Sequence, residues 1–382
     1  MDQQQGRPSG GRLLAAGLLW GGAAIGLLVW QPTASQGVRQ GLSICAQTLI
    51  PSLFPFMALS GVMANLGADR LLAAPFAPVL SRLLKIPPAL CGPVLMSFLG
   101  GYPVGARLVA RLQREGRIDP STARRMMVFS FAGAPSFLIG AVGIQVLGGP
   151  LQGLVVYLAQ VAAALLLGSL WGRRRSAGPI RPPKEGRPLT PSAALVEGVS
   201  GAATGMLVIC AFACLFVAVS ALLEETGLPE QLGRLLETVI GGALPEAAGE
   251  VLLSGLLEIT CGVQRAAALP YGLRFLLVPF LLSFGSLSVL CQVAASFEGL
   301  PFSFGWFAGV RFLHGLLTAL LAAPILFRIP LPAQVFSSLP QPAPMDGTMV
   351  LGIPAMVGMC SVLLLTLCGE SGSLPRRPRR LP

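Results

Sequence analysis

Long apolar runs separated by short polar segments dominate the chain and predict membrane-spanning helices. Eight of them carry almost no charge and have the length of about 20 residues that a helix needs to cross about 30 Å of hydrocarbon. We predict the spans at 13–30, 42–66, 126–147, 150–171, 198–222, 275–297, 302–327 and 349–368. The first is interpreted as a retained helix, because the residues that follow it make a poor signal-peptide cleavage site.

Some apolar stretches are broken by glycine, proline or polar residues, and these stretches occur in matching pairs. The first pair aligns at an offset of 157 and the second at an offset of 153. In the first pair, Gly105 corresponds to Gly262. Broken hydrophobic segments at corresponding places in two halves are the best sequence indication of a transporter's binding site. The pairs are 95–106 with 252–263, and 130–140 with 283–293.

The two halves share one order of parts. Each has a span, a short amphipathic piece, a broken segment too short to cross (88–106 or 248–265), an interrupted span and an ordinary span. We interpret the broken segment as a re-entrant hairpin. Each half then crosses three times, so the sequence predicts an all-α polytopic membrane protein with two inverted repeats. The predicted divisions are an N-terminal segment 1–39, repeats 40–171 and 198–327, a basic linker 172–197 between them, and a C-terminal segment 328–382 with a final span.

The net charge of +11 is distributed unevenly. With the N-terminus in the cytoplasm and alternating spans, 21 of the 27 basic residues fall on the cytoplasmic side, and a glutamate cluster at 224–250 falls outside. This positive-inside bias predicts that both termini are cytoplasmic and that the lipid bilayer is the protein's surroundings. No aromatic residues alternate with the arginines, so no nucleic-acid partner is expected.

Cysteine and histidine usage predicts neither a metal site nor a disulfide framework. The eight cysteines lie singly in apolar stretches, and His314 is the only histidine. The chain has no His-Glu-x-x-His motif, no Gly-x-Ser-x-Gly elbow and no phosphate-binding P-loop. We therefore expect no metal, no cofactor and no enzymatic activity.

The broken segments supply most of the candidate substrate-binding residues. In residues 100–105 (GGYPVG) the proline cannot donate and the glycines allow close backbone approach, which leaves N–H groups free at the start of a helix. Such an N-terminus is a ready anion site. The same argument applies at 260–262 and at 133–136, where a serine can cap the next half-helix. The candidates are Gly101, Tyr102, Pro103, Gly105, Ser136, Thr260, Ser288 and Gln292.

Glu258, Arg311 and His314 are ionisable residues at or near membrane depth, where charges are costly and usually functional. Arg311 and His314 share a helix face, and Gln160 stands at the position of the first repeat that corresponds to His314. In one interpretation Arg311 forms a structural ion pair with Glu258 or Glu298. In the other, Arg311 binds an anionic substrate and His314 couples a proton, which the ordinary pKa of histidine would suit.

Five short motifs together resemble the YlbJ (SpoVV) family of sporulation integral membrane proteins over residues 40–327. In one of them, FGSLSVLCQ, Ser286 stands where a second glycine is expected. The motifs are PSLFPF at 51–56, GYPVGA at 101–106, GAPSF at 133–137, GLLEITCG at 255–262 and FGSLSVLCQ at 284–292.

The resemblance implies a fold and a substrate. The family belongs to the gate or nucleoside-recognition group, whose membrane fold resembles concentrative nucleoside transporters with two re-entrant hairpins. It implies a transporter that moves dipicolinic acid out of the mother cell across the outer forespore membrane. Dipicolinate is a small planar dianion, and helix N-termini with an arginine suit two carboxylates.

Two other functions stay open. A nucleoside-type permease would use Glu258 and Gln292 for the ribose. A non-transporting scaffold of the spore envelope would recruit partners through the basic cytoplasmic loops, but it leaves the paired broken segments unexplained. The sequence also leaves a homo-oligomer open.

Overall fold

The computed structural model describes residues 10–172, 180–181, 189–239 and 245–330, and these residues form helices without a strand. The all-α prediction is thereby confirmed for the described part of the chain. The predicted final span, 349–368, lies outside the described residues.

Five helical segments of the described chain are long and apolar enough to cross a membrane, and a bent pair of shorter helices raises the number to six if it counts as one span. Their positions agree with five of the predicted spans. The predicted span 13–30 forms α1 (Gly10–Val29), whereas 126–147 is divided between two helices. The five are α2–η1–α3 (Gln31–Ile44, Cys45–Leu49 and Ile50–Leu66), α9 (Pro150–Gly172), α10 (Pro191–Glu225), α14–α15 (Tyr271–Phe284 and Ser286–Ser296) and α16 (Phe304–Leu326).

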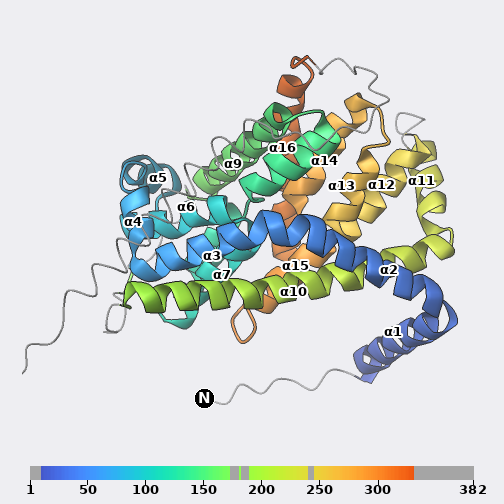
Figure 1. The fold of residues 1–382 in the computed structure, drawn as a ribbon, viewed down its shortest axis with the longest axis horizontal. Helices are drawn as coiled ribbons and strands as arrows, with labels where there is room; N and C mark the ends of the chain where they lie inside the picture. Colours follow the sequence, from blue (N-terminus) through green and yellow to red (C-terminus); the bar gives the residue numbers. More distant parts are fainter. Residues whose placement is uncertain (1–9, 173–179, 182–188, 240–244, 331–382) are drawn as a thin grey trace, which may run out of the picture.

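The α2–α3 span and α10 lie side by side in opposite directions (Figure 1). Early residues of one span meet late residues of the other, since Gly41 packs on Cys214 and Gly61 on Gly198. A Cβ at Gly61 would lie 3.2 Å from the Cα of Gly198, so these helices approach closely through their glycines. Close packing at small residues is the usual way in which helices associate in a membrane.

A second antiparallel pair is formed by α9 and α16, which pack against each other (Figure 1). The end of α9 meets the beginning of α16, where the rings of Trp171 and Trp306 lie 6.4 Å apart. The helix α14 also packs along α16.

The chain reverses direction in each of the two broken segments. In the first, α6 (Cys91–Gly100) turns at Gly101, with φ of 83°, into α7 (Tyr102–Arg114), which packs back on α6. In the second, α12 (Glu246–Leu257) turns at Glu258 into α13 (Ile259–Ala266), which packs back on α12. We call these the first and second hairpins. Whether each enters and leaves the membrane on one side, as the sequence predicts, stays a prediction.

Gly105 and Gly262, which the sequence aligns with each other, have the same packing role in the two hairpins. A Cβ on Gly105 would collide with the carbonyl of Ser130 and lie 2.9 Å from the Cβ of Ser97 on the preceding helix. A Cβ on Gly262 would collide with Gly255 of its own preceding helix. Both hairpins therefore close because a glycine faces the partner helix.

Two helices are interrupted beside the hairpin tips. The first interruption, residues 130–135, separates α8 (Pro120–Phe129) from the π-helix η3 (Ser136–Leu147). The second, between α14 and α15, lies at Gly285 and Ser286, with φ of 94° and 61°. The expectation of a glycine at 286 has a direct reason, because left-handed backbone favours glycine and here a serine adopts it.

Short helices lie at opposite ends of the molecule (Figure 1). At one end are α4 (Ala68–Ala73), α5 (Ala77–Leu84) and the 3-10 turn η2 (Pro88–Leu90), and at the other is α11 (Leu228–Val239). The antiparallel pairs and these opposite ends are consistent with the predicted inversion of the two halves, which itself stays a prediction.

Candidate functional site

The two hairpin tips meet at one small cavity in the centre of the helix bundle, which we call the central cavity. Tip residues Tyr102 and Pro103 line it from the first hairpin, and Glu258 and Thr260 line it from the second. Its volume is about 40 Å³, enough for very few water molecules. The complete lining is Leu49, Leu53, Tyr102, Pro103, Ala134, Phe137, Ile209, Ala213, Glu258, Ile259, Thr260, Val289 and Gln292.

Both interrupted helices also reach the central cavity, so four breaks in the chain converge there. Ala134 and Phe137 come from the interruption between α8 and η3, and Val289 and Gln292 come from α15 just after the other interruption. Irregular backbone at membrane depth is tolerated where protein or a polar cavity satisfies its groups. The sequence-predicted Tyr102, Pro103, Glu258, Thr260 and Gln292 are brought together here.

The first tip is fixed to the interruption of the second half by Tyr102 and Gln160. The break at Gly285 frees carbonyls of the preceding turn. Tyr102 Oη donates to the carbonyl of Leu282, and Gln160 Nε2 donates to the same carbonyl at 3.1 Å and to Ser283 Oγ at 3.0 Å. The other amide atom of Gln160, Oε1, accepts from the N–H of Gly133 at 2.8 Å. One side chain thus satisfies polar groups of both interruptions.

Glu258 occupies the N-terminus of the helix that follows it. Its backbone is extended, with φ of −139°, and its Oε2 accepts from the N–H of Cys261 at 2.8 Å. The expectation of a free anion site at 260–262 is therefore wrong for this structure, because the chain's own carboxylate takes that place. The side chain is only 2% exposed.

Thr260 carries a buried hydroxyl at the wall of the central cavity. Its Oγ1 is buried without a hydrogen bond of good geometry to any described residue, although the Glu258 carboxylate lies close enough to interact with it. A buried hydroxyl without a proper partner costs stability. Such a group at the wall of a cavity is a natural contact for a bound molecule.

The two tips differ in charge. At the first tip the N-cap of α7 is Gly101, which has no side chain to cap the helix, so the positive end of the helix dipole stays open beside the cavity. At the second tip the carboxylate of Glu258 caps α13. The central cavity therefore has a partly positive wall and a carboxyl wall.

Gln292 and Ser288 form one polar pair on α15. Gln292 lines the cavity, and its Nε2 donates to Ser288 Oγ at 3.3 Å. Ser288 itself is fully buried behind Gln292 and does not line the cavity. Ser288 therefore holds the amide of Gln292, which faces the cavity, through this hydrogen bond.

Comparison with known proteins finds a relative of this chain. The chain is 27% identical over 321 residues, 76% of its length and 78% of the relative, to the sporulation integral membrane protein YlbJ of Bacillus subtilis strain 168. This similarity supports the resemblance to the YlbJ family that the sequence motifs indicate. No family model matches the chain, and no solved structure matches it. The match and the apolar helices support the conclusion that the chain is an integral membrane protein.

Arg311 lies beside the two interruptions and does not line the central cavity. Its guanidinium is fully buried, donates to the carbonyl of Phe131 at 3.0 Å and to the carbonyl of Ser283, and sits 4.3 Å above the Phe131 ring. It forms no ion pair with a described residue, so the expected pair with Glu258 or Glu298 is wrong. Its role as a substrate ligand stays a prediction.

His314 and Ser136 lie away from the central cavity as well. His314 is fully buried, and its Nε2 lies 2.9 Å from the carbonyl oxygen of Gln160. Ser136 Oγ donates to the carbonyl of Ser52 at 2.5 Å and caps no helix, so the expected capping role is wrong. Ser52 belongs to α3, so this bond ties the first interruption to the α2–α3 span.

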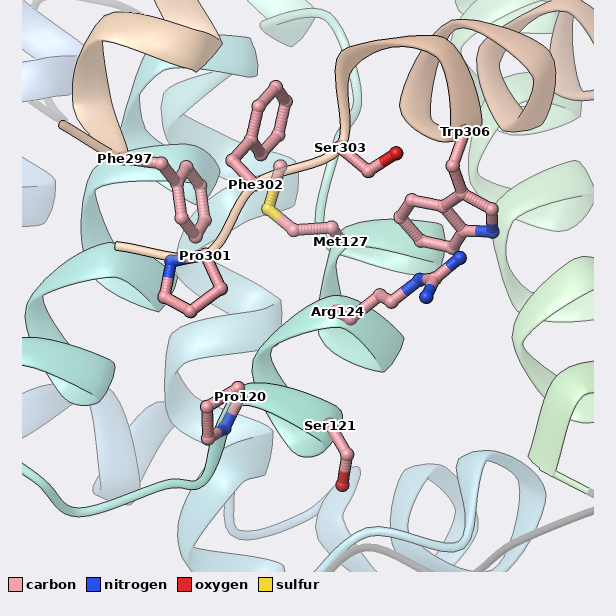
Figure 2. A pocket seen from close by; sticks show the side chains of 9 residues that line it. All are labelled: Pro120, Ser121, Arg124, Met127, Phe297, Pro301, Phe302, Ser303 and Trp306. Atoms are coloured by element: carbon pink, nitrogen blue, oxygen red, sulfur yellow. The ribbon is translucent and has the colours of Figure 1, made fainter. Parts of the chain in front are cut away.

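A larger cavity lies between α8 and the loop before α16, and Figure 2 shows its lining. Its volume is about 430 Å³, and the guanidinium of Arg124 stacks 4.4 Å above the ring of Trp306 on one wall. No sequence-predicted site residue lines it, and it shares no residue with the central cavity.

Sequence reasoning missed the apolar wall of the cavity and the importance of Gln160. Ile209 and Ala213 on α10 face the tips, but they are ordinary span residues in the sequence. Gln160 was visible only as the counterpart of His314 at an offset of 154. A buried amide in an otherwise apolar span is the signal by which it can be found.

Proposed function

We propose that this protein is a secondary transporter that moves a small aromatic dicarboxylate, dipicolinate, out of the mother cell across the outer forespore membrane during sporulation. One observation carries the proposal. Two hairpin tips, about 155 residues apart in the sequence, face each other across the same cavity beside two helix interruptions. Paired discontinuous helices around a central site are the typical arrangement of secondary transporters.

The proposal includes alternating access around the central cavity. Ligand pockets usually measure about 300–1,000 Å³, whereas this one measures about 40 Å³. The structure therefore has the tips closed, and binding requires at least one hairpin to move from the other. We propose that the halves are inverted repeats, that the hairpins are re-entrant from opposite sides and that both termini are cytoplasmic.

The polar groups at the tips suit a planar anion that also accepts hydrogen bonds. The open N-terminus of α7 offers positive partial charge, and the Thr260 hydroxyl and Gln292 amide offer neutral donors. The carboxyl group of Glu258 repels a dianion unless a proton is bound at the site. We therefore propose that a proton accompanies the substrate, with Glu258 and His314 as the two groups to test.

A nucleoside-type permease is the second candidate, and one observation favours it. Glu258 and Gln292 both face the cavity, and a carboxylate with an amide is suited to ribose hydroxyls. Because Glu258 would then bind the ribose hydroxyls, this candidate predicts that Glu258→Gln reduces nucleoside uptake. It also predicts that uptake of a neutral nucleoside needs no proton to offset charge repulsion. The scaffold function, in contrast, predicts no transport at all.

Uptake by purified protein in liposomes tests the proposal. Dipicolinate and a set of nucleosides are offered separately, with and without a proton gradient. We expect saturable dipicolinate uptake that nucleosides do not inhibit. Uptake of nucleosides alone would replace the leading proposal by the permease, and absence of uptake for all of them, from protein that is correctly folded, would favour the scaffold.

A further inference from the structure

Two clefts lie along α7, between the central cavity and the end of the molecule where α3 ends and α10 begins. The first cleft, about 230 Å³, lies between α7, α10 and α15, and the second, about 300 Å³, lies between α3, α7 and α10. Both are lined by Arg107 and Arg114. The first cleft shares Pro103, Ile209 and Gln292 with the central cavity, so the cleft and the cavity adjoin.

One face of α7 lines this route along its whole length. Pro103 at the tip is followed by Arg107, Arg111 and Arg114, and spacings of three and four residues place side chains on one helix face. A helix rises 1.5 Å per residue, so this face extends about 16 Å from the cavity. We call Arg107, Arg111 and Arg114 the arginine stripe.

The arginine stripe carries positive charge that the fold does not neutralise. Arg107 donates to the main-chain carbonyls of Gly201, at 2.6 Å, and Pro103, at 3.2 Å. Arg114 donates to the carbonyl of Ser296 at 2.5 Å. Neither forms an ion pair with a described residue.

Acidic groups near the stripe offset only part of its charge. Arg111 pairs with Glu115, whose Oε1 lies 2.8 Å from its Nε. Glu197 on α10 lines the second cleft without an ion pair to any described residue. Carbonyl dipoles position a guanidinium without cancelling its charge, so an excess of positive charge remains in both clefts.

Arg107 is held in place before any ligand arrives. Its guanidinium lies against the backbone of α10 at Gly205, where a Cβ would collide with it. A fixed cation at the inner end of a cleft loses little conformational entropy when an anion binds to it.

We propose that the arginine stripe is the approach path by which a small carboxylate anion reaches the central cavity. Clefts lined by charge of one sign raise the local concentration of the opposite ion and its on-rate by about 10- to 1,000-fold. The arginine nearest the cavity, Arg107, is four residues from the tip proline. This inference rests on the proposed transport function for its substrate, but its electrostatic part is testable without transport.

The first experiment measures the local potential. Thr204 lines the first cleft and is exposed, so Thr204→Cys places a thiol there in the full chain. The rates at which this thiol reacts with anionic and cationic methanethiosulfonates are compared by mass spectrometry of the peptide that contains residue 204. We expect the anionic reagent to be favoured about tenfold or more, and R107Q with R114Q to remove the preference. Equal rates for the two reagents in the parent protein would overturn the inference.

The second experiment connects the path with transport. R111Q with R114Q should raise the KM for dipicolinate uptake about tenfold with little change in kcat. The control, R70Q with R82Q, removes the same charge from exposed arginines that line neither cleft and should change neither constant.

The outcomes of the two experiments separate the inference from the function. Equal effects of the two pairs on KM would show a general charge effect and overturn the path. An anion preference at residue 204 in a protein that does not transport dipicolinate would reject that substrate and keep the path for another anion.

Discussion

The imidazole Nε2 of His314 and the main-chain oxygen of Gln160 lie 2.9 Å apart in the centre of the molecule. The two residues are 154 positions apart and come from antiparallel helices, α16 and α9, that the sequence aligns with each other. Equivalent residues of two related halves meet where an approximate two-fold axis passes. The contact is what inverted repeats would produce, and it motivates the proposed symmetry.

The same two helices hold both interruptions in place. Gln160 of α9 binds Leu282 and Ser283 of the second half, and Arg311 of α16 binds Phe131 of the first half. Each half therefore satisfies polar backbone that the other half leaves free. This exchange explains why polar side chains are retained at membrane depth, and it predicts separate effects on folding and on transport.

Arg311→Gln should destabilise the fold. It leaves carbonyls of Phe131 and Ser283 without their donor, and each buried group without a partner costs about 1–3 kcal/mol. We expect a lower unfolding temperature in detergent and loss of transport together. A variant with unchanged unfolding temperature and no dipicolinate uptake would instead make Arg311 a substrate ligand.

Gly105→Ala and Gly262→Ala should both prevent their hairpins from closing. The added methyl collides with the carbonyl of Ser130 in one case and with Gly255 in the other. Gly309→Ala is the matched control, because nothing lies within 4 Å of a Cβ at this position of α16. We expect lower unfolding temperatures and lower yields of folded protein for the first two, and no loss for the control. Wild-type stability of either hairpin variant would contradict the packing described here.

Alanine usually stabilises a helix more than glycine does, but the left-handed backbone at Ser286 reverses this order of stability. In a helix interior alanine is favoured by about 1 kcal/mol, whereas at φ of 61° glycine avoids a steric cost of about 1–2 kcal/mol. We expect Ser286→Gly to unfold at a higher temperature than Ser286→Ala. Neither variant keeps the Ser286 hydroxyl that accepts from the N–H of Val289, so the comparison isolates the backbone. The opposite order would show that residue 286 does not adopt this conformation.

The arrangement of the elements was largely visible in the sequence, and the side-chain contacts were not. The hydrophobic pattern gave the long spans, and the alignment of Gly105 with Gly262 identified residues with the same packing role. Periodicity and glycine placement are local properties that a sequence displays directly.

The partners of Arg311 and the place of Glu258 depend on contacts between distant segments. A buried cation is stable with main-chain carbonyls as well as with a carboxylate, and the sequence does not choose between them. Arg311 reached carbonyls freed by helix breaks, and Glu258 capped its own helix. The difference in capping between the two tips occurs at Glu258, a residue that the sequence identified as an ionisable group at or near membrane depth.

Thr260→Val is the substitution that tests the central cavity most directly. Valine has nearly the shape of threonine, and the hydroxyl it removes has no well-formed hydrogen bond in the fold. Thr318→Val is the control, because the Thr318 hydroxyl is also buried but bonds to the carbonyl of His314 on its own helix, away from the cavity.

The decisive measurement is dipicolinate uptake into liposomes by these two variants and the parent protein, together with their unfolding temperatures. We predict that Thr260→Val unfolds at or above the parent's temperature but takes up dipicolinate at least about tenfold more slowly, as the loss of a hydrogen bond of about 1.4 kcal/mol would give, whereas Thr318→Val keeps uptake. Unchanged uptake by Thr260→Val would contradict the assignment of the cavity between the hairpin tips as the substrate site.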